Sequence, residues 1–553
     1  MIGMRVLSAA EMQTCDRVTS ECFGVPSLKL MRNAAAAIAE IAQREFPAAR
    51  RVTVLCGRGN NGADGMMAAR LLAEAGKDVT TILLGAACTL KEDAATAWRE
   101  LNNPAREKIH VVVEPEDLQH FAAALDTDLI VDAVVGTGFV PPLRGLALAA
   151  LEWVKQSKAP VLAVDLPSGW GADATSETAE GPVFPADAVA TFTAPKPAHV
   201  FGALTRRWDQ PIVIAPIGSP DAAIASTLGV TWAGDSLELA QQRRARKANK
   251  GNFGHVLVIG GAMGTAGGKA GAPAMAAMAA MRAGSGLVTA AVPAPALPVV
   301  AGFAPELMTQ PLTATRTGEI SAKNATAARL NSLLKGKTVL AVGPGLGQSA
   351  DAAQFVAALL AQSKIPVVVD ADALNLLAAK PRMLAALAKQ ARAGRVVVFT
   401  PHPGEMARLC KKTIVEVQAA RLETARGFAQ KHGMTVVLKG SRTLIAHPDG
   451  TVAVNTTGNP AMAKGGSGDV LTGIVAAMLA QHAAEPAKAV EAAVCLHGLA
   501  ADLMVHSADE HVLLATDTLR AFSQAFQFCF RGKSGYVWLQ GTPDGARPDG
   551  AGK

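Results

Sequence analysis

Short runs of β-branched residues alternate with Ala- and Leu-rich segments along almost all of the 553 residues. This alternation constrains the fold more than any other feature, because strands that alternate with helical segments predict parallel sheets covered by helices on both faces. In the first half the strand candidates are RVTVLC (51–56), DVTTILL (78–84), IHVVV (109–113), DLIVDAVV (128–135), PVLAVD (160–165), AVATFT (188–193) and PIVIA (211–215).

The second half repeats the pattern, with helical segments at 271–284 and 469–482. We therefore expect an α/β protein made of two three-layer α/β/α domains. The strand candidates of this half are 254–261, 287–292, 338–343, 366–370, 395–400, 435–440, 443–447 and 451–455. The expected divisions are a first domain at 1–228, a polar and basic linker at 229–250, a second domain at 251–528, and a Gly- and Pro-rich disordered tail at 529–553.

The composition favours a cytoplasmic protein with no membrane partner. Hydrophobic residues make up 50% of the chain, yet Gly, Pro or a charge interrupts them every few residues. No run of about 18 uninterrupted apolar residues marks a membrane span, and acidic residues come too early at the N-terminus for a secretory signal. The seven cysteines form no CxxC or Cys/His cluster, which is typical of a reducing compartment and argues against structural zinc.

The charge distribution argues against nucleic acid as a partner. The net charge is +7, and the basic run RRARKANK (243–250) supplies much of it. Aromatic residues are only 4% of the chain and do not alternate with the basic ones, so this run is interpreted as a solvated linker. The excess positive charge would still attract nucleotide-like anions.

Three loops of the first half each follow a predicted strand: GRGNNGADG (57–65), DAVVGTG (132–138) and DLPSG (165–169). Ligands of open parallel sheets bind beyond the carboxyl ends of the strands, so these loops predict a site. The two strand-end acids, Asp132 and Asp165, together with a loop asparagine would offer oxygen ligands that favour a hard cation. The alternative for each acid, considered alone, is that it only caps a turn or a helix.

The order GNNGxDG, DAxxGTG, DxPSG resembles the NAD(P)H-hydrate epimerase domain over roughly residues 5–225. The resemblance implies a Rossmann-like domain that interconverts the R and S forms of the hydrated cofactors NADHX and NADPHX. It makes Asp165 the acid/base group, and Asn61, Asp132 and Ser168 the ligands of a potassium ion. The implied substrate site comprises Asn60, Asn61, Gly62, Ala63, Asp64, Gly136, Thr137, Gly138, Phe139, Val140, Pro141, Pro142 and Asp165.

One departure from the family pattern concerns the first loop, because a glycine usually stands where this chain has Ala63. The added methyl group either crowds the ligand or is harmless. If it crowds the ligand, the first domain is a non-catalytic binding module.

The segment GNPAMAKGGSGDVLTG (458–473) surrounds one acid, Asp469, with glycines just before a predicted helix. A glycine-rich turn at a helix N-terminus is an anion site, because free N–H groups and the helix dipole point at the ligand. An acid there repels phosphate, so its useful role is to take a proton from an attacking hydroxyl while the amides stabilise developing charge. The alternative is that Asp469 only caps the helix.

Other loops of this half also follow strands. KGSRT (439–443) is a Lys-Gly turn of the kind that holds nucleotide phosphates, and it is also readable as a plain hairpin turn. PHPGE (401–405) holds His402 in a rigid loop. GPGLG (343–347) leaves backbone free to approach a ligand, and Ala272 begins a helix of small residues.

In this order, GHVLVIGG, GKAGA…RAGSGLV, GPGLG, PHPGE, KGSRT and NPAMAKGGSGDVLTG resemble the ADP/ATP-dependent NAD(P)H-hydrate dehydratase over about residues 250–525. The resemblance implies a ribokinase-like domain that binds ADP with Mg²⁺. The residues implied to contact the hydrate are Ala272, Gly347, His402 and Asp469. Those implied to contact the nucleotide are Lys439, Gly440, Ser441, Arg442, Thr443 and Gly468.

Together the two resemblances imply a bifunctional isomerase and lyase for cofactor repair, and a homo-oligomer. Asp469 would take the proton of the ring hydroxyl, the terminal phosphoryl group of ADP would pass to that oxygen, and loss of phosphate would restore NAD(P)H. The alternative is a small-molecule kinase of the ribokinase-like class, of the vitamin-precursor type, with a non-catalytic N-terminal binding domain.

Overall fold

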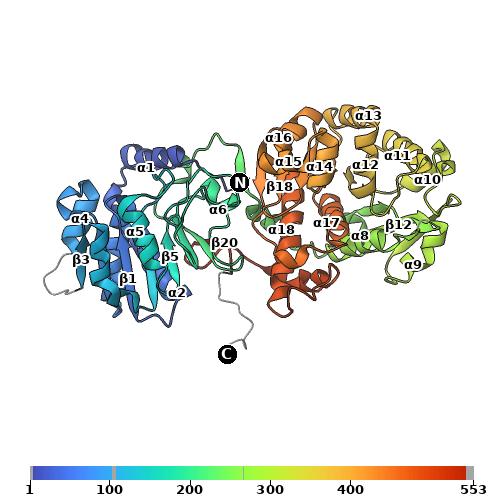
Figure 1. Ribbon diagram of the computed structural model, residues 1–553. Coiled ribbons are helices and arrows are strands. Elements are labelled where there is room, and N and C mark those ends of the chain that lie inside the picture. Colours follow the sequence, from blue (N-terminus) through green and yellow to red (C-terminus); the bar gives the residue numbers. More distant parts are fainter. Residues whose placement is uncertain (1–3, 102–107, 266, 543–553) are drawn as a thin grey trace. The chain divides into compact units, whose positions relative to one another are not determined.

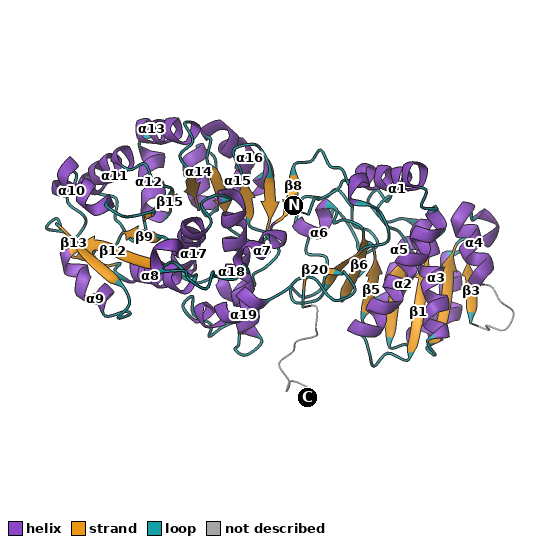
Figure 2. Cartoon of the chain, turned by 180° about the vertical axis from the view of Figure 1, so that it is seen from behind, coloured by secondary structure: helices purple, strands orange, loops and turns teal. Residues whose placement is uncertain are grey.

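The computed structural model of the chain describes residues 4–101, 108–265 and 267–542. These residues form two compact units, one built from residues 4–229 and 529–542 and the other from residues 230–528 (Figure 1). Each unit is a largely parallel β-sheet between helices (Figure 2), which confirms the prediction of two α/β domains. Within the described ranges, no helix is both long and apolar enough to cross a bilayer.

The sheet of the first unit has the strand order β20-β7-β6-β5-β4-β1-β2-β3, and every pair except β20 and β7 is parallel. The chain runs outward from β1 through β2 to β3 and then returns to β4 on the other side of β1. The strand order therefore reverses between β1 and β4. The strands are β1 (Arg51–Cys56), β2 (Asp78–Leu84), β3 (Ile109–Val112), β4 (Leu129–Ala133), β5 (Val161–Val164), β6 (Ala188–Phe192), β7 (Ile212–Ala215) and β20 (Val537–Gln540).

Helices cover both faces of this sheet because strand side chains alternate between two cores. Val54 and Cys56 of β1 pack in one core with α2, α3 and α4, whereas Leu55 packs in the other with α5 and the 3-10 helix η2. The helices are α1 (Ala9–Phe23), α2 (Ser27–Glu45), α3 (Asn60–Glu74), α4 (Glu92–Leu101), α5 (Gly145–Val154) and α6 (Pro197–Phe201), with 3-10 turns η1 (Ala87–Thr89), η2 (Pro115–Leu125) and η3 (Asp221–Ala223).

The end of the chain corrects one prediction. Strand β20 pairs antiparallel with β7, and Trp538 is fully buried. Tyr536 joins the same core and donates a hydrogen bond from its hydroxyl to Glu40 at 2.7 Å. The expectation of a disordered tail is therefore wrong for residues 529–542, because these residues are ordered by partners more than 300 positions away. Residues 543–553 lie outside the described ranges.

The sheet of the second unit has the order β13-β12-β9-β14-β15-β16-β17-β18-β19-β8. Neighbours from β13 to β17 are parallel, and β18 runs antiparallel to both of its neighbours. The strands are β8 (Val230–Trp232), β9 (His255–Ile259), β12 (Leu287–Pro293), β13 (Met308–Leu312), β14 (Val339–Val342), β15 (Val367–Val369), β16 (Val397–Phe399), β17 (Thr435–Leu438), β18 (Leu444–Ala446) and β19 (Val452–Val454), and a separate hairpin joins β10 (Met263–Gly264) to β11 (Gly267–Gly268).

Helices α8 and α17 pack against the central strands, and α18 packs outside α17. Figures 1 and 2 show α11, α12, α13 and α16 on the other side of this sheet. The α-helices are α7 (Leu237–Ala240), α8 (Gly271–Arg282), α9 (Leu297–Ala301), α10 (Ala327–Leu334), α11 (Ala350–Gln362), α12 (Ala371–Ala379), α13 (Pro381–Arg392), α14 (Pro403–Cys410), α15 (Ile414–Ala419), α16 (Arg421–His432), α17 (Ser467–Gln481), α18 (Pro486–Val505) and α19 (Phe522–Gln527).

The expected linker at 229–250 begins with ordered structure, which is a second correction. Strand β8 extends the edge of the second sheet beside β19. Trp232 is buried there and donates its Nε1–H to the hydroxyl of Thr456 at 2.9 Å. The second domain therefore starts at residue 230, because one buried aromatic side chain fixes this segment to the sheet.

Candidate active sites

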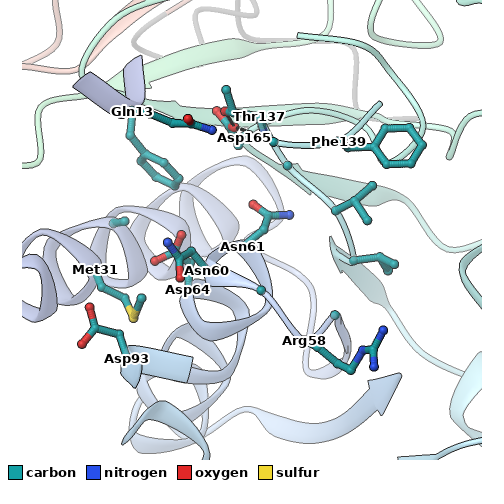
Figure 3. A pocket seen from close by; sticks show the side chains of 18 of the residues that line it. Gln13, Met31, Arg58, Asn60, Asn61, Asp64, Asp93, Thr137, Phe139 and Asp165 are labelled. Carbon is teal, nitrogen blue, oxygen red and sulfur yellow. Dashed lines mark hydrogen bonds between the residues drawn. The ribbon is translucent and has the colours of Figure 1, made fainter. Parts of the chain in front are cut away.

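The first candidate site lies where the strand order of the first unit reverses, at the carboxyl ends of β1, β4 and β5. This is the position at which open α/β sheets bind ligands. A cavity of about 1040 Å³ opens there (Figure 3). The predicted residues that line it are Asn60, Asn61, Asp64, Gly136, Thr137, Gly138, Phe139 and Asp165.

Two predicted residues of the first loop lie behind the cavity wall. Gly62 is buried in the first turn of α3, where a Cβ would overlap the carbonyl oxygen of Gly57. Ala63 is fully buried and packs in the core with α2 and β1. The methyl group of Ala63 therefore points into the core and does not crowd the cavity, so this departure from the family pattern leaves the cavity open.

The loop after β4 also extends past the cavity. Val140, Pro141 and Pro142 do not line it, and Val140 is 82% exposed. Pro141 and Pro142 instead lie near Gly171 and Gly181, in the segment between β5 and β6. Among the predicted residues of this loop, those up to Phe139 face the cavity.

Asp165 is the most strongly held of the cavity residues. Its carboxyl accepts hydrogen bonds from the Thr137 amide at 3.0 Å, from the hydroxyl of Thr137, and from Thr191 at 2.9 Å. The Lys196 ammonium lies 2.8 Å away, and both side chains are buried. Burial alone would raise the pKa of Asp165, but the charges of Lys196 and His199 and these hydrogen bonds hold it well below its usual range. The pair is therefore an ionised carboxylate and an ammonium, both at the cavity.

His199 fixes the backbone beneath this pair. The Lys196 amide donates to His199 Nδ1 at 2.9 Å, so the ring proton is on Nε2, which donates to the Asp165 carbonyl at 2.7 Å. Burial, and then the charge of Lys196, lower the pKa of His199 to about 4, so the ring is neutral. This bond holds Asp165 in a left-handed conformation with φ of 64°, and strain of this kind at a non-glycine residue is associated with functional sites.

Further carboxyls line the same cavity. Asp16, on α1, has a buried Oδ1 with no hydrogen-bond partner among the described residues, and burial raises its pKa to about 6. Burial and the charges of Asp165, Asp16 and Asp93 raise the pKa of Asp64 well above its usual value. The cavity is therefore lined by carboxyls whose pKa values are shifted in opposite directions, down at Asp165 and up at Asp16 and Asp64.

The predicted potassium ligands Asp132 and Ser168 lie just outside the cavity and are fully buried. Asp132 accepts hydrogen bonds from the Ser168 hydroxyl at 2.6 Å and its amide at 2.8 Å. No cationic side chain among the described residues pairs with it, and burial raises its pKa to about 6. Asn61 has a buried amide nitrogen to which no described residue hydrogen-bonds. A buried, uncompensated carboxylate among oxygen donors fits a hard cation.

The second candidate site lies at the N-terminus of α17, beside the reversal of strand order between β9 and β14. Asp469 lies in the first turn of α17, and no other described residue hydrogen-bonds to its carboxyl. Burial, and then the charge of Asp370, raise its pKa to about 7, against the opposing effect of Lys439. The carboxyl can therefore exchange a proton near neutral pH.

The glycines before Asp469 have separate structural roles. Gly466 has φ of 97°, and a Cβ there would meet the sulfur of Met275 at 2.8 Å. A Cβ at Gly468 would lie 3.2 Å from Lys439 Nζ. Gly465 has open space around it. The turn thus needs glycine for its conformation at 466, and at 468 the absence of a Cβ leaves room for the lysine ammonium.

Lys439 is held beneath this turn by acids. Its ammonium lies 3.0 Å from Asp370 and 3.9 Å from Glu405, and these charges outweigh burial and raise its pKa. Arg421 holds the rest of the predicted nucleotide loop by donating to the Ser441 carbonyl at 2.8 Å, and the Thr443 hydroxyl donates to the Gly440 carbonyl at 2.8 Å. Arg442 has φ of 51°, so the loop 439–443 is a fixed, strained turn with a cation at its base.

His402 caps α14 and remains half-exposed. Its Nδ1 accepts from the Gly404 amide at 3.0 Å, so the proton of the neutral ring is on Nε2, which lies 3.4 Å from Glu405 Oε1. Burial, and then the charges of Lys439 and Arg408, lower its pKa. The Glu405 carboxyl therefore lies between His402, a predicted hydrate contact, and the Lys439 ammonium.

Ala272 and Gly347 come together at the other side of the site. Gly345, in the same loop as Gly347, has φ of 61°, and a Cβ there would lie 3.3 Å from the Cβ of Ala272. Gly347 has φ of 86°, and its amide donates to Asp372 at 2.9 Å. Two of the predicted hydrate contacts, Ala272 in the first turn of α8 and Gly347 in the loop after β14, therefore lie on neighbouring segments.

Both halves of the chain are similar to proteins of known families. A family model described as NAD(P)H-hydrate dehydratase matches residues 256–524, and one described as YjeF-related protein N-terminus matches residues 27–198. The bifunctional NAD(P)H-hydrate repair enzyme of Moorella thermoacetica is 38% identical over 529 residues, which cover 93% of this chain and 95% of that protein. The chain belongs to the bifunctional NAD(P)H-hydrate repair enzyme family.

Other members of this family are similar over comparable lengths. The repair enzyme of Escherichia coli is 34% identical over 514 residues, which cover 92% of this chain and 91% of that protein. Among solved structures, the ADP/ATP-dependent NAD(P)H-hydrate dehydratase from Bacillus subtilis, co-crystallised with ATP and Mg²⁺, is 32% identical, covers 53% of this chain and 96% of its own, and has a TM-score of 0.44.

Several residues at the two sites were not predicted from the sequence. Lys196 was detectable only as a lysine between two prolines after the 188–193 strand. Asp370 ends the VVVD strand just as Asp132 and Asp165 end theirs, so the same strand-end signal was available for it. Asp16 had no local signal, because α1 reaches the cavity only through tertiary packing.

Proposed function

We propose that this chain repairs hydrated nicotinamide cofactors, with an epimerase in the first unit and an ADP-dependent dehydratase in the second. The observation that carries the proposal is Asp469. This carboxyl has a pKa of about 7, accepts no hydrogen bond from any described residue, and stands at a glycine-lined helix N-terminus near the charge of Lys439. General bases work best when their pKa lies near the operating pH. The similarity to repair enzymes over the full chain supports the same assignment.

In the proposed dehydratase, Asp469 takes the proton from the hydroxyl on the hydrated S ring. The terminal phosphoryl group of ADP passes to that oxygen while the α17 amides, aided by the nearby Lys439, stabilise its charge. Phosphate then leaves with the C–O bond electrons as the ring nitrogen lone pair forms a new bond, and loss of a ring proton restores NAD(P)H. Mg²⁺ bound to the nucleotide would neutralise phosphate charge.

The proposed hydrate contacts are Ala272, Gly347 and His402, and the loop 439–443 is the proposed nucleotide contact. The contact between the loops of Gly345 and Ala272 supports a shared hydrate site. The fixed turn held by Arg421 supports a preformed phosphate loop.

In the proposed epimerase, Asp165 and Lys196 handle the protons. Inverting the hydroxyl-bearing carbon requires a bond to it to break and to re-form on the other face, and each step moves a proton. Asp165 as a carboxylate accepts a proton, and Lys196 as an ammonium donates one. Asn60, Asn61 and Asp64 and the loop 136–139 would bind the nucleotide portion in the 1040 Å³ cavity.

A potassium ion is proposed beside this cavity, with oxygen ligands from Asn61, Asp132 and Ser168. The buried carboxylate of Asp132, which lacks a cationic partner among the described residues, supports it. Bound potassium would supply the missing positive charge and fix the loops after β4 and β5. We further expect a homo-oligomer that acts in the cytoplasm.

The proposal is tested by incubating the full chain with mixed R and S hydrate epimers, ADP and Mg²⁺, and following absorbance of the reduced cofactor. Full recovery of both epimers, faster than spontaneous interconversion, with release of free phosphate, is the expected result. Recovery that stops after the S epimer would refute the epimerase assignment. A stable phosphorylated product would instead favour the small-molecule kinase.

A further inference from the structure

The segment Asp370–Ala371–Asp372 lies between β15 and α12 and has an unusual backbone. Ala371 adopts φ of 49°, a left-handed conformation that alanine rarely adopts. Such a residue persists only where its surroundings hold it, and strain of this kind is associated with functional sites. Both flanking carboxyls are buried, with Asp370 1% and Asp372 8% exposed.

Among the described residues, the carboxyl of Asp370 accepts hydrogen bonds only from the side of the site that carries the base. Its Oδ1 accepts from Lys439 Nζ at 3.0 Å, and its Oδ2 accepts from the Thr472 hydroxyl at 2.6 Å. Thr472 is three residues after Asp469, so both lie on the same face of α17. Asp370 therefore fixes α17, one turn after Asp469, relative to Lys439.

The carboxyl of Asp372 accepts hydrogen bonds from the opposite side, within the part of the chain that the structure describes. Its Oδ2 accepts from the Gly347 amide at 2.9 Å and from Lys269 Nζ at 3.3 Å, and its Oδ1 accepts from the Gln348 side chain at 2.8 Å. These partners belong to the GPGLG loop and to the loop just before α8. Asp372 therefore links the loop that carries the proposed hydrate contact Gly347 to the segment that leads into α8, whose first turn carries Ala272.

We infer that Asp370 and Asp372 are positioning residues with divided roles in the dehydratase. Asp370 sets the geometry of proton and phosphoryl transfer through Lys439 and Thr472, and Asp372 sets the shape of the hydrate-binding loops. The strained Ala371 links the two, so that substrate and base are held by one rigid segment. This inference rests on the proposed dehydratase function.

The experiment compares Asp370→Asn and Asp372→Asn in the full chain, by steady-state dehydration of the S hydrate with ADP and Mg²⁺. Misplacement of the base and lysine should lower kcat of Asp370→Asn by up to about 10²-fold, with KM for the hydrate nearly unchanged. Loss of one loop-holding carboxylate should raise KM of Asp372→Asn by about tenfold, with kcat nearly unchanged.

Asp449→Asn is the matched control. Asp449 also accepts two hydrogen bonds, from the amide and hydroxyl of Thr451, but it lies in the turn between β18 and β19. Its kcat and KM should match those of the wild type. Thermal unfolding of all variants checks that each is folded.

Thr472→Val keeps the inference testable if Asp370→Asn does not fold. It removes the hydroxyl bond to Asp370 while keeping the buried volume, and should lower kcat without changing KM. If the wild type dehydrates the hydrate but the variants lose kcat and KM together, or match Asp449→Asn, the inference is refuted. A wild type without ADP-dependent dehydration refutes the proposed function itself, and the inference with it.

Discussion

Replacing Asp469 by Asn should separate stability from catalysis. Burial and the charge of Asp370 raise the pKa of Asp469 to about 7, from an ordinary value of 3.8. The shift is about three units, which corresponds to at most ~4 kcal/mol of folding free energy at about 1.4 kcal/mol per unit. The ionised carboxylate therefore destabilises the folded protein, and the uncharged amide would remove that cost.

The sign of the pH dependence follows from the direction of the shift. Because the folded-state pKa is higher than the unfolded one, the folded protein binds more protons between about pH 4 and pH 7. Stability of the wild type due to this group therefore falls as pH rises through that window. We expect Asp469→Asn to be more stable than the wild type at pH 8 and nearly equal to it at pH 4, as measured by thermal unfolding.

Catalysis should change in the opposite sense. Asp469→Asn should lower the dehydration rate by about 10²–10⁴-fold, the usual effect of removing a general base. The wild-type rate should rise with pH through about 7 as the carboxyl ionises. The assay is recovery of reduced-cofactor absorbance from the S hydrate with ADP and Mg²⁺.

Asp449→Asn again provides the control. Burial raises the pKa of Asp449, but hydrogen bonds from Thr451 outweigh it and lower the pKa, so this carboxylate stabilises the folded state above the unfolded pKa. The control should be less stable at pH 8 and fully active. Near-normal turnover of Asp469→Asn would refute the base role, and a stability difference that does not depend on pH would refute the raised pKa.

Three further predictions concern the first unit. Lys196→Met leaves Asp165 buried without its cation, so it should lower the free energy of unfolding in denaturant by about 3–5 kcal/mol. It should also abolish epimerisation but not dehydration, and retained epimerisation would contradict the role of the pair. Replacing potassium by tetramethylammonium should slow the wild-type epimerase and lower its thermal midpoint, and Asp132→Asn should lose both responses. Trp538→Ala should destabilise the first unit by about 3–5 kcal/mol, detected by calorimetry, with dehydratase activity unchanged; an unaltered midpoint would show that β20 adds no stability.

Many features of the fold were predictable because they are local. The strand candidates of both halves correspond to strands of the two sheets. Short β-branched runs such as VTVLC and VVVD, set between helical segments, predict strands and nothing else. The site loops were predictable for the same reason. A glycine-rich turn at a strand end, such as 57–65 after β1 or 343–347 after β14, must lie at the edge of the sheet where ligands bind.

Features that depend on distant partners were not predictable. Residues 537–540 have a weak strand pattern in a Gly- and Pro-rich segment, and they become a strand only because β7 presents a free edge. Trp232 orders the start of the expected linker through Thr456, which is 224 residues away in the sequence. Local secondary-structure propensity cannot reveal either interaction, because the partners are far apart in the sequence.

The sequence by itself therefore determined the α/β class, the strand-end loops and the acid at the start of α17, because each depends on residues within one turn or strand. Only the tertiary structure decided the charge states of those acids. Asp165 is paired with Lys196 and strongly ionised, whereas Asp469 faces Asp370 and holds its proton near neutral pH. The physical reason is that burial and the nearest charges set a pKa, and these come from segments 31 and 99 positions away.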